Sequence, residues 1–82
     1  MAIRVLYFAA CRERTGVAAE DLELGDLGST VADVVAAVIA RHPALGTVAA
    51  QCRVAVNQAF ARASDPVPDG AELALIPPVA GG

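Results

Sequence analysis

The stretch TVADVVAAVIARHP, residues 30–43, decides the fold of this chain because it can form a helix with one apolar face. Thr30 is placed to accept the first free backbone N–H, and Asp33, three residues later, completes a capping-box pattern. The apolar side chains at helical spacing are Val31, Val34, Val35, Val38 and Ile39. Because β-branched residues are poor helix formers, tertiary packing must hold this helix. We expect it to run from about Val31 to His42.

The sequence also predicts where this helix ends. Arg41 and His42 suit the negative end of the helix dipole, and Pro43 cannot continue the helix. We therefore interpret His42 as a helix-end residue and not as a catalyst.

Short apolar segments on both sides of the helix have the pattern of strands. The expected strands are Ala2–Phe8, Asp21–Leu24, Arg53–Asn57, a short one around Phe60, and Glu72–Ile76. The first and last are apolar on both faces, which favours central strands covered on both sides. Residues 9–15 allow one or two helical turns ended by Gly16, and turns are expected at 25–28, 57–58 and 65–70. This order predicts a small α+β domain.

Composition limits what the chain can be. Its 82 residues suffice for one compact domain; 56% are hydrophobic and 18% charged, which argues against disorder. The net charge of −3 offers no basic face for nucleic acid, and no apolar run is long enough to span a membrane. The start lacks the pattern of a signal peptide. We expect a cytoplasmic protein with no nucleic-acid or membrane partner.

The chain offers few groups for chemistry of its own. It has no lysine, and its two cysteines, Cys11 and Cys52, lack CxxC spacing and a neighbouring histidine. With His42 they are too few for a metal site, so no metal is expected. We interpret both cysteines as small buried apolar residues. No nucleophile–base pair stands out, so no catalytic site of its own is expected.

The last six residues, Pro77-Pro78-Val79-Ala80-Gly81-Gly82, follow directly on the last strand. Prolines restrict themselves and the residues before them to extended geometry, so the chain should leave the domain stiffly. Gly81 and Gly82 have no side chain, so such a tip can enter a narrow channel in another protein. We predict a domain over residues 1–76 and an extended tail over 77–82.

Several segments resemble the ubiquitin-like sulfur carriers, specifically the small subunits of molybdopterin synthase, and the resemblance covers the whole chain. They are Phe8-Ala9, Arg12-Glu13, Gly16, Thr30-Val31, Ala55-Val56-Asn57, Asp69-Gly70 and the tail. The most specific is the tail, Pro-Pro-Val-small-Gly-Gly. The resemblance implies a β-grasp fold, a mixed sheet around one main helix with its first and last strands side by side.

The resemblance also implies a chemistry carried at Gly82. A carboxylate is ionised at neutral pH and is a poor electrophile. In this family an ATP-using partner adenylates the terminal glycine and sulfur transfer then gives a thiocarboxylate. The large synthase subunit receives the tail, Pro77 to Gly81, and the sulfur passes to a cyclic pyranopterin monophosphate in molybdenum cofactor biosynthesis. The chain itself would bind no cofactor; ATP is used by the activating enzyme.

Three further positions match the family's partner contacts: Phe60 and Ile76 as apolar surface residues, with Arg12 as a basic one. Phe60 and Ile76 can also be read as core residues. Two other functions stay open. One is a sulfur carrier for thiamine or another sulfur-containing product, and the other is a β-grasp module that binds a partner non-covalently.

Overall fold

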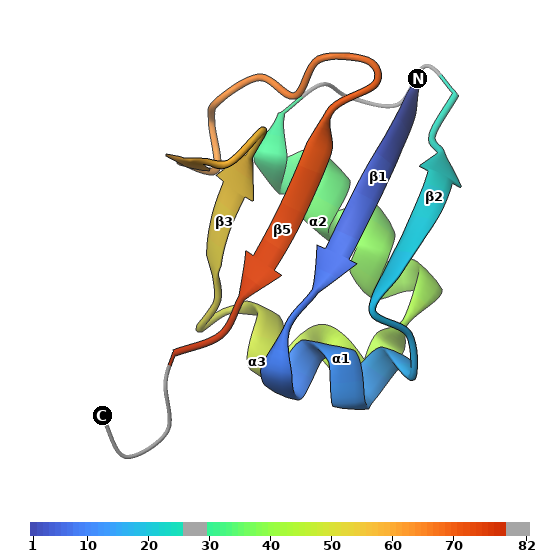
Figure 1. Ribbon diagram of the computed structural model, residues 1–82, viewed down its shortest axis with the longest axis vertical. Helices are drawn as coiled ribbons and strands as arrows, with labels where there is room; N and C mark the ends of the chain where they lie inside the picture. The colour runs from blue at the N-terminus through green and yellow to red at the C-terminus, as the bar shows by residue number, and fades with distance from the viewer. Residues whose placement is uncertain (26–29, 79–82) are drawn as a thin grey trace.

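The computed structural model describes residues 1–25 and 30–78, which form a sheet with helices packed on one face (Figure 1). In these residues the elements are β1 (Ala2–Tyr7), α1 (Ala9–Thr15), β2 (Ala19–Glu23), α2 (Val31–Arg41), the 3₁₀ helix η1 (Pro43–Leu45), α3 (Gly46–Ala49), β3 (Arg53–Val56), β4 (Ala59–Ala61) and β5 (Glu72–Ile76). Their strands form one sheet in the order β2-β1-β5-β3-β4. β1 and β5 run parallel as neighbours, while the other neighbouring pairs are antiparallel. The predicted β-grasp fold is confirmed.

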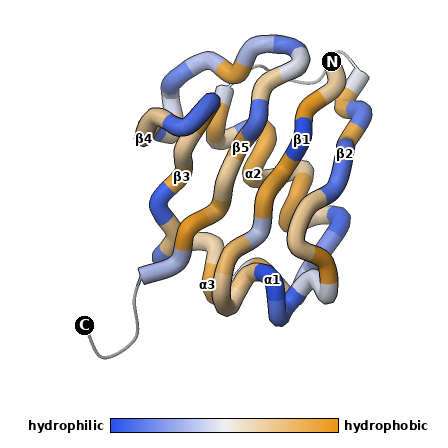
Figure 2. The backbone as a smooth tube through the Cα atoms, in the orientation of Figure 1, coloured by the Kyte–Doolittle hydropathy of each residue, from blue (hydrophilic) through white to orange (hydrophobic). Residues whose placement is uncertain are grey.

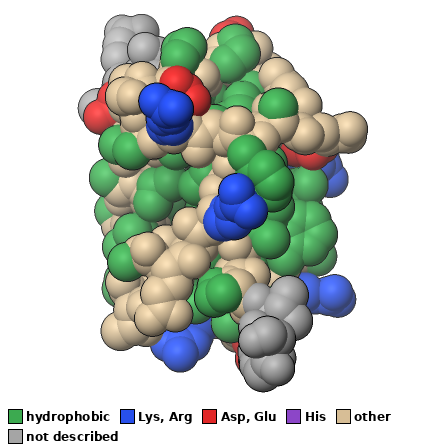
Figure 3. Space-filling model, turned by 90° about the vertical axis from the view of Figure 1, so that its left-hand side faces the viewer, with side chains coloured by type: hydrophobic (Ala, Val, Ile, Leu, Met, Phe, Trp, Pro, Cys, Tyr) green, Lys and Arg blue, Asp and Glu red, His purple; other side chains and the backbone are tan. Residues whose placement is uncertain are grey.

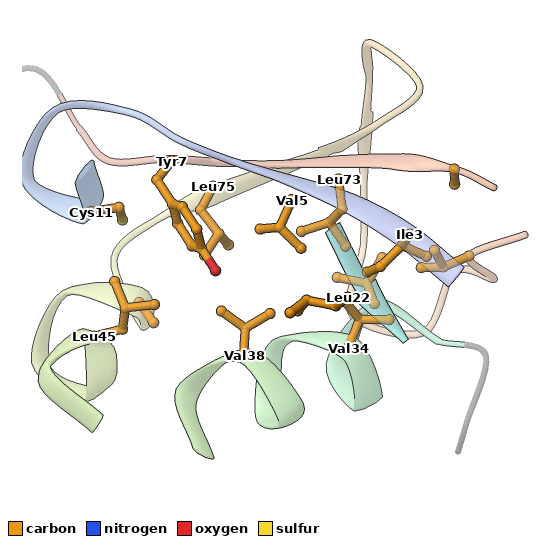
Figure 4. Packing of buried hydrophobic residues seen from close by; sticks show 14 residues of the cluster. Ile3, Val5, Tyr7, Cys11, Leu22, Val34, Val38, Leu45, Leu73 and Leu75 are labelled. Carbon is orange, nitrogen blue, oxygen red and sulfur yellow. The ribbon is translucent and has the colours of Figure 1, made fainter. Parts of the chain in front are cut away.

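The core lies between the inner face of the sheet and α2. Ile3, Val5 and Tyr7 alternate along β1 and point toward α2, as Figure 4 shows, because successive side chains of a strand point to opposite faces. From α2, Val34 and Val38 meet them with no exposed surface. Figure 2 shows the same layering as hydrophobic colour along β1, β5 and α2.

The capping box that opens α2 is present as predicted. The Thr30 hydroxyl accepts a hydrogen bond from the backbone N–H of Asp33, and the Asp33 carboxylate accepts one from the backbone N–H of Thr30. The helix ends at Arg41, one residue earlier than expected, and His42 is its C-cap residue.

Turn chemistry sets the other connections. Gly16 ends α1 at a φ of 80°, a left-handed conformation that glycine adopts without steric cost. Asn57 and Gln58 have φ of 50° and 70° and join β3 to β4, which confirms the predicted turn and the short strand around Phe60. Of the turn expected at 25–28, Gly25 has a φ of 60°; its other positions lie outside the described residues.

Two expectations need correction. The second strand runs from Ala19 to Glu23 and not from Asp21 to Leu24, because its pairing with β1 extends back toward the end of α1. The sequence pattern predicts no element over residues 43–52, but these residues contain η1 and α3, held by the buried side chains of Leu45 and Ala49. No helix in the described part of the chain is long and apolar enough to cross a membrane.

The prediction that β1 is covered on both sides is wrong. β1 is central in the sheet, but helices pack on one face alone (Figure 1). On the other face Leu6 is partly exposed, and Phe8, just past the end of β1, is 47% exposed. An apolar run on both faces of a strand therefore indicated an open apolar surface here and not a second covering layer.

Candidate functional site

The C-terminal segment leaves the sheet at the end of β5. Ile76 pairs with Arg53 of β3 at the last register position, which places the exit beside that strand. Pro77 is still buried, while Pro78 is exposed. The predicted reactive and tail positions Val79, Ala80, Gly81 and Gly82 lie outside the described residues. The division into residues 1–76 and 77–82 stays a prediction.

Beside this exit, the outer face of the sheet holds a shallow apolar pocket. Its lining comes from four strands and the residues that flank them. The lining residues are Leu6, Phe8, Ala55, Gln58, Phe60, Glu72, Ala74 and Ile76. The sheet register explains the grouping, because Leu6 pairs with Ala74, Ala74 with Ala55, and Ala55 with Phe60 across successive strands. We call this set the outer pocket.

Phe60 is the most exposed large apolar side chain of the outer pocket. It is 63% exposed, so the alternative reading of Phe60 as a core residue is wrong, while Ile76 is partly buried. The Arg53 guanidinium lies 4.0 Å from the centre of the Phe60 ring in a cation–π contact. This contact orients the ring and brings a positive charge to the edge of the outer pocket.

The structure brings Phe60 and Ile76 into one pocket, while Arg12 lies outside its lining. Arg12 is exposed on α1, one turn after Phe8, and its backbone N–H donates to the Phe8 carbonyl oxygen. It is not part of the outer-pocket lining. Arg12 is therefore connected to the outer pocket only through this backbone hydrogen bond to Phe8, which is a lining residue.

Sequence reasoning missed Leu6, Phe8 and Arg53 as members of this surface. The signal for Leu6 and Phe8 was present, since both lie on the second apolar face of β1. It was interpreted as burial. Arg53 could not be recognised, because its position over Phe60 depends on the pairing of β3 with β4.

Apart from the outer pocket, a cluster of polar side chains lies around Glu20 of β2. The Tyr7 hydroxyl donates to the Glu20 carboxylate, His42 Nε2 contacts the same oxygen, and Arg41 Nε donates to the other oxygen at 3.0 Å. Burial of Glu20 opposes its ionisation, but the hydrogen bonds from Tyr7, His42 and Arg41 outweigh that effect and lower its pKa. For Tyr7, burial and the Glu20 carboxylate raise the pKa.

This cluster ties the end of α2 to the first two strands. The His42 ring also meets the Tyr7 ring edge-on, with centroids 5.7 Å apart. His42 therefore sits at the helix end, as predicted, but its contacts with Glu20 and Tyr7 were missed. The polar side chains of this cluster hydrogen-bond to one another and so hold α2, β1 and β2 together. Among residues 1–25 and 30–78, no three His, Cys, Asp or Glu side chains gather as a metal site requires.

The two cysteines also meet. Cys11 of α1 is fully buried and Cys52, just before β3, is partly buried, with their Sγ atoms 3.3 Å apart. The prediction of burial is therefore confirmed for Cys11 and correct in part for Cys52. Their proximity was not foreseen, because the cysteines are 41 positions apart in the sequence.

Comparison with known proteins places this chain and its fold in a class. The model of the ThiS family matches residues 5–82. The crystal structure of SAMP1 from Haloferax volcanii superposes with a TM-score of 0.89 at 29% identity, over 100% of both chains. A chain of the Amycolatopsis orientalis BexX/CysO complex superposes with a TM-score of 0.75 at 25% identity, over 98% of this chain and 99% of that one. The chain belongs to the ThiS family, with the ubiquitin-like β-grasp fold.

The relatives narrow the class further. The chain is 48% identical to the molybdopterin synthase sulfur carrier subunit of Chlamydomonas reinhardtii, over 100% of both sequences. It is 37% identical to the protein of the same name from Mycobacterium tuberculosis, over 98% of this chain and 96% of that one. Within its family, the chain therefore groups with the molybdopterin synthase sulfur carrier subunits.

Proposed function

We propose that this chain is a sulfur carrier for molybdenum cofactor biosynthesis, with Gly82 as the carrier residue. The observation that carries the proposal is the full-length match, at 48% identity, to a molybdopterin synthase sulfur carrier subunit. The sequence carries Gly81-Gly82, whose terminal carboxylate is the group that this chemistry would activate. Among the described residues, Glu20, Tyr7 and His42 contact one another and join elements of the fold, so the proposal places the carrier chemistry at Gly82 and not at this cluster.

The proposed chemistry begins with activation of the Gly82 carboxylate. A carboxylate oxygen attacks the α-phosphorus of ATP on a partner enzyme, and pyrophosphate leaves. A sulfur nucleophile at the oxidation level of sulfide then displaces AMP and leaves a thiocarboxylate. Activation is needed because the ionised carboxylate is a poor electrophile at neutral pH. The acid–base groups and the ATP site belong to the partner.

The proposed second partner is the large subunit of molybdopterin synthase, which would receive Pro77 to Gly81 and pass the sulfur to cyclic pyranopterin monophosphate. The outer pocket supports docking, because Phe60 exposes 63% of its surface beside the tail's exit. Large apolar anchors of this kind dominate many interfaces. Arg53, which stacks on the Phe60 ring, adds positive charge at the edge of this surface, and Arg12 is exposed one turn after Phe8.

The decisive experiment removes Gly82 and measures thiocarboxylate formation by intact mass after incubation with ATP, the activating enzyme and a sulfur donor. The chain ending at Gly81 should fold as the full chain does and remain unloaded. A matched control is Gly46→Ala, because Gly46 is exposed, far along the chain from the tail, and an added Cβ there meets nothing within 4 Å. Full sulfur loading of the truncated chain would refute the proposal.

The product pathway needs a separate test, because the terminal glycine is chemically the same in all such carriers. Discrimination must come from the docking surface and the segment before the glycines. The chain is expressed in one bacterial mutant that lacks its molybdopterin synthase small subunit and in another that lacks its thiamine sulfur carrier. We expect rescue of nitrate reduction and no thiamine-independent growth. Rescue of thiamine synthesis alone would assign the chain to that pathway, and an unloadable chain that still binds partners would indicate a non-covalent module.

A further inference from the structure

The fold brings Cys11 and Cys52 into contact, and the proposed sulfur carriage at Gly82 does not use either cysteine. Cys11 belongs to α1 and Cys52 precedes β3, so a bond between them would join two elements far apart in sequence. Both are free thiols, and their Sγ atoms are 3.3 Å apart. Bond formation requires the sulfurs to approach by about 1 Å, within the reach of small side-chain rotations.

Of the two cysteines, Cys52 is the one that solvent can reach. Cys52 lines an open groove between α2 and β3, together with Val35, Ile39 and Val54. Figure 3 views the side of the molecule on which β3 lies and shows hydrophobic side chains gathered there. Cys11 has no exposed surface. A small solute in the groove therefore meets Cys52 and not Cys11, which does not line it.

We propose that Cys11 and Cys52 form a disulfide modification site, closed by a peroxide that enters through this groove. The Cys52 sulfur attacks one peroxide oxygen, the O–O bond breaks, and a sulfenic acid and water (or an alcohol) result. The Cys11 sulfur then attacks the Cys52 sulfur, and the sulfenic oxygen leaves as a second water with the Cys11 proton. Two thiols are oxidised by two electrons and the peroxide is reduced. A dithiol reductant reverses the bond.

The surroundings set the rate of this reaction. Burial raises the pKa of the Cys52 thiol to about 12, with the neighbouring Cys11 adding to the effect, so the nucleophilic thiolate is scarce at neutral pH. The site closes slowly and under sustained oxidation. Once closed, it staples α1, which carries Arg12, to the start of β3, which carries Arg53. The disulfide does not use the tail, but Arg53 and Phe60 of the proposed docking surface also line the groove, so its entrance adjoins that surface.

The test treats the purified full-length chain with hydrogen peroxide, alkylates it under denaturing conditions, and digests it with trypsin. Cleavage after arginine releases Cys11 in residues 5–12 and Cys52 in residues 42–53. We expect these two peptides joined by a disulfide, loss of both alkylatable thiols in the monomer, and a rise in melting temperature on the order of 10 °C that dithiothreitol reverses. Two free thiols after prolonged oxidation, or disulfides only between molecules, would overturn the proposal.

Single variants test the order of events. In Cys11→Ser, peroxide should leave a sulfenic acid on Cys52 that dimedone traps, and the melting temperature should not rise. In Cys52→Ser, Cys11 should resist both peroxide and iodoacetamide in the folded chain. If peroxide oxidised Cys11 in Cys52→Ser as readily as it oxidises Cys52 in Cys11→Ser, entry through the groove would be contradicted. Because the main test uses the unaltered chain, a variant that fails to fold leaves its outcome intact.

Discussion

The two faces of the sheet carry similar side chains but end in different environments. On the inner face, Val5, Leu73 and Leu75 have no exposed surface, because α2 packs over them. On the outer face, Phe8 and Phe60 are 47% and 63% exposed, because no element of the described chain covers them. Burial of apolar surface is favourable on either face. The inner face is therefore completed by the chain itself, and the outer face has apolar surface left for a partner.

The largest expected effect breaks the inner face. Leu73→Ala removes a fully buried side chain of β5 from the core beneath α2, and should lower the free energy of unfolding by about 3 kcal/mol. Urea denaturation measures this directly. Affinity per folded molecule for the large subunit should not change. A loss below 1 kcal/mol would show that this face is less tightly packed than the structure indicates.

The next effect breaks the outer face. Phe60→Asp should weaken binding of the large subunit at least tenfold, about 1.4 kcal/mol, while stability changes little because the ring is exposed. Titration calorimetry measures the affinity. The matched control is Val17→Asp, which places the same charge on an exposed apolar residue outside the outer pocket. Unchanged affinity for the Phe60 variant, or equal losses for both, would refute the docking surface.

The third prediction concerns the polar cluster around Glu20, which lies at the end of the inner face of the sheet. Glu20→Gln should lower stability by about 1 kcal/mol at pH 7, through weaker hydrogen bonds to Tyr7 and Arg41. The pKa of Glu20 is lowered by folding, so its contribution is present above its ordinary value of 4.5 and is lost as the pH falls through the folded value.

The gap in stability between the unaltered chain and Glu20→Gln should therefore shrink as the pH is lowered below about 4.5. Thermal unfolding of both chains across this range measures it. Glu13→Gln, which changes an exposed carboxylate of α1, is the control and should show no such gap. A gap that widens toward low pH would mean that the cluster favours a protonated Glu20.

The smallest expected effect concerns Arg53. Arg53→Gln removes the cation–π contact with Phe60 and should lower stability by about 0.5 kcal/mol, since the pair is exposed. Affinity for the large subunit should fall less than for Phe60→Asp. Arg62→Gln, at another exposed arginine, controls for the lost charge. Equal effects of the two arginine changes on affinity would assign the role of Arg53 to charge alone.

Local signals predicted much of this molecule. The Thr30–Asp33 capping box, the end of α1 at Gly16 and the Asn57-Gln58 turn depend on neighbouring residues, and each was predicted correctly. The β-grasp arrangement with the first and last strands side by side came from resemblance, and the structure confirms it and shows that the two strands run parallel. For the site, Phe60 and Ile76 line one pocket beside the exit of β5, and their contact with a partner stays a prediction.

What the sequence determined by itself was the five strands and the first two helices, because capping, turns and apolar alternation act over a few residues. It did not predict η1 and α3. What only the tertiary structure decided was which distant residues meet. The Cys11–Cys52 contact, the Glu20 cluster and the Arg53–Phe60 stack each join residues from different elements. The exposure of Phe8 was decided in the same way. The physical reason is that an apolar side chain on a strand is buried only where another layer packs, and α2 covers one face of the sheet.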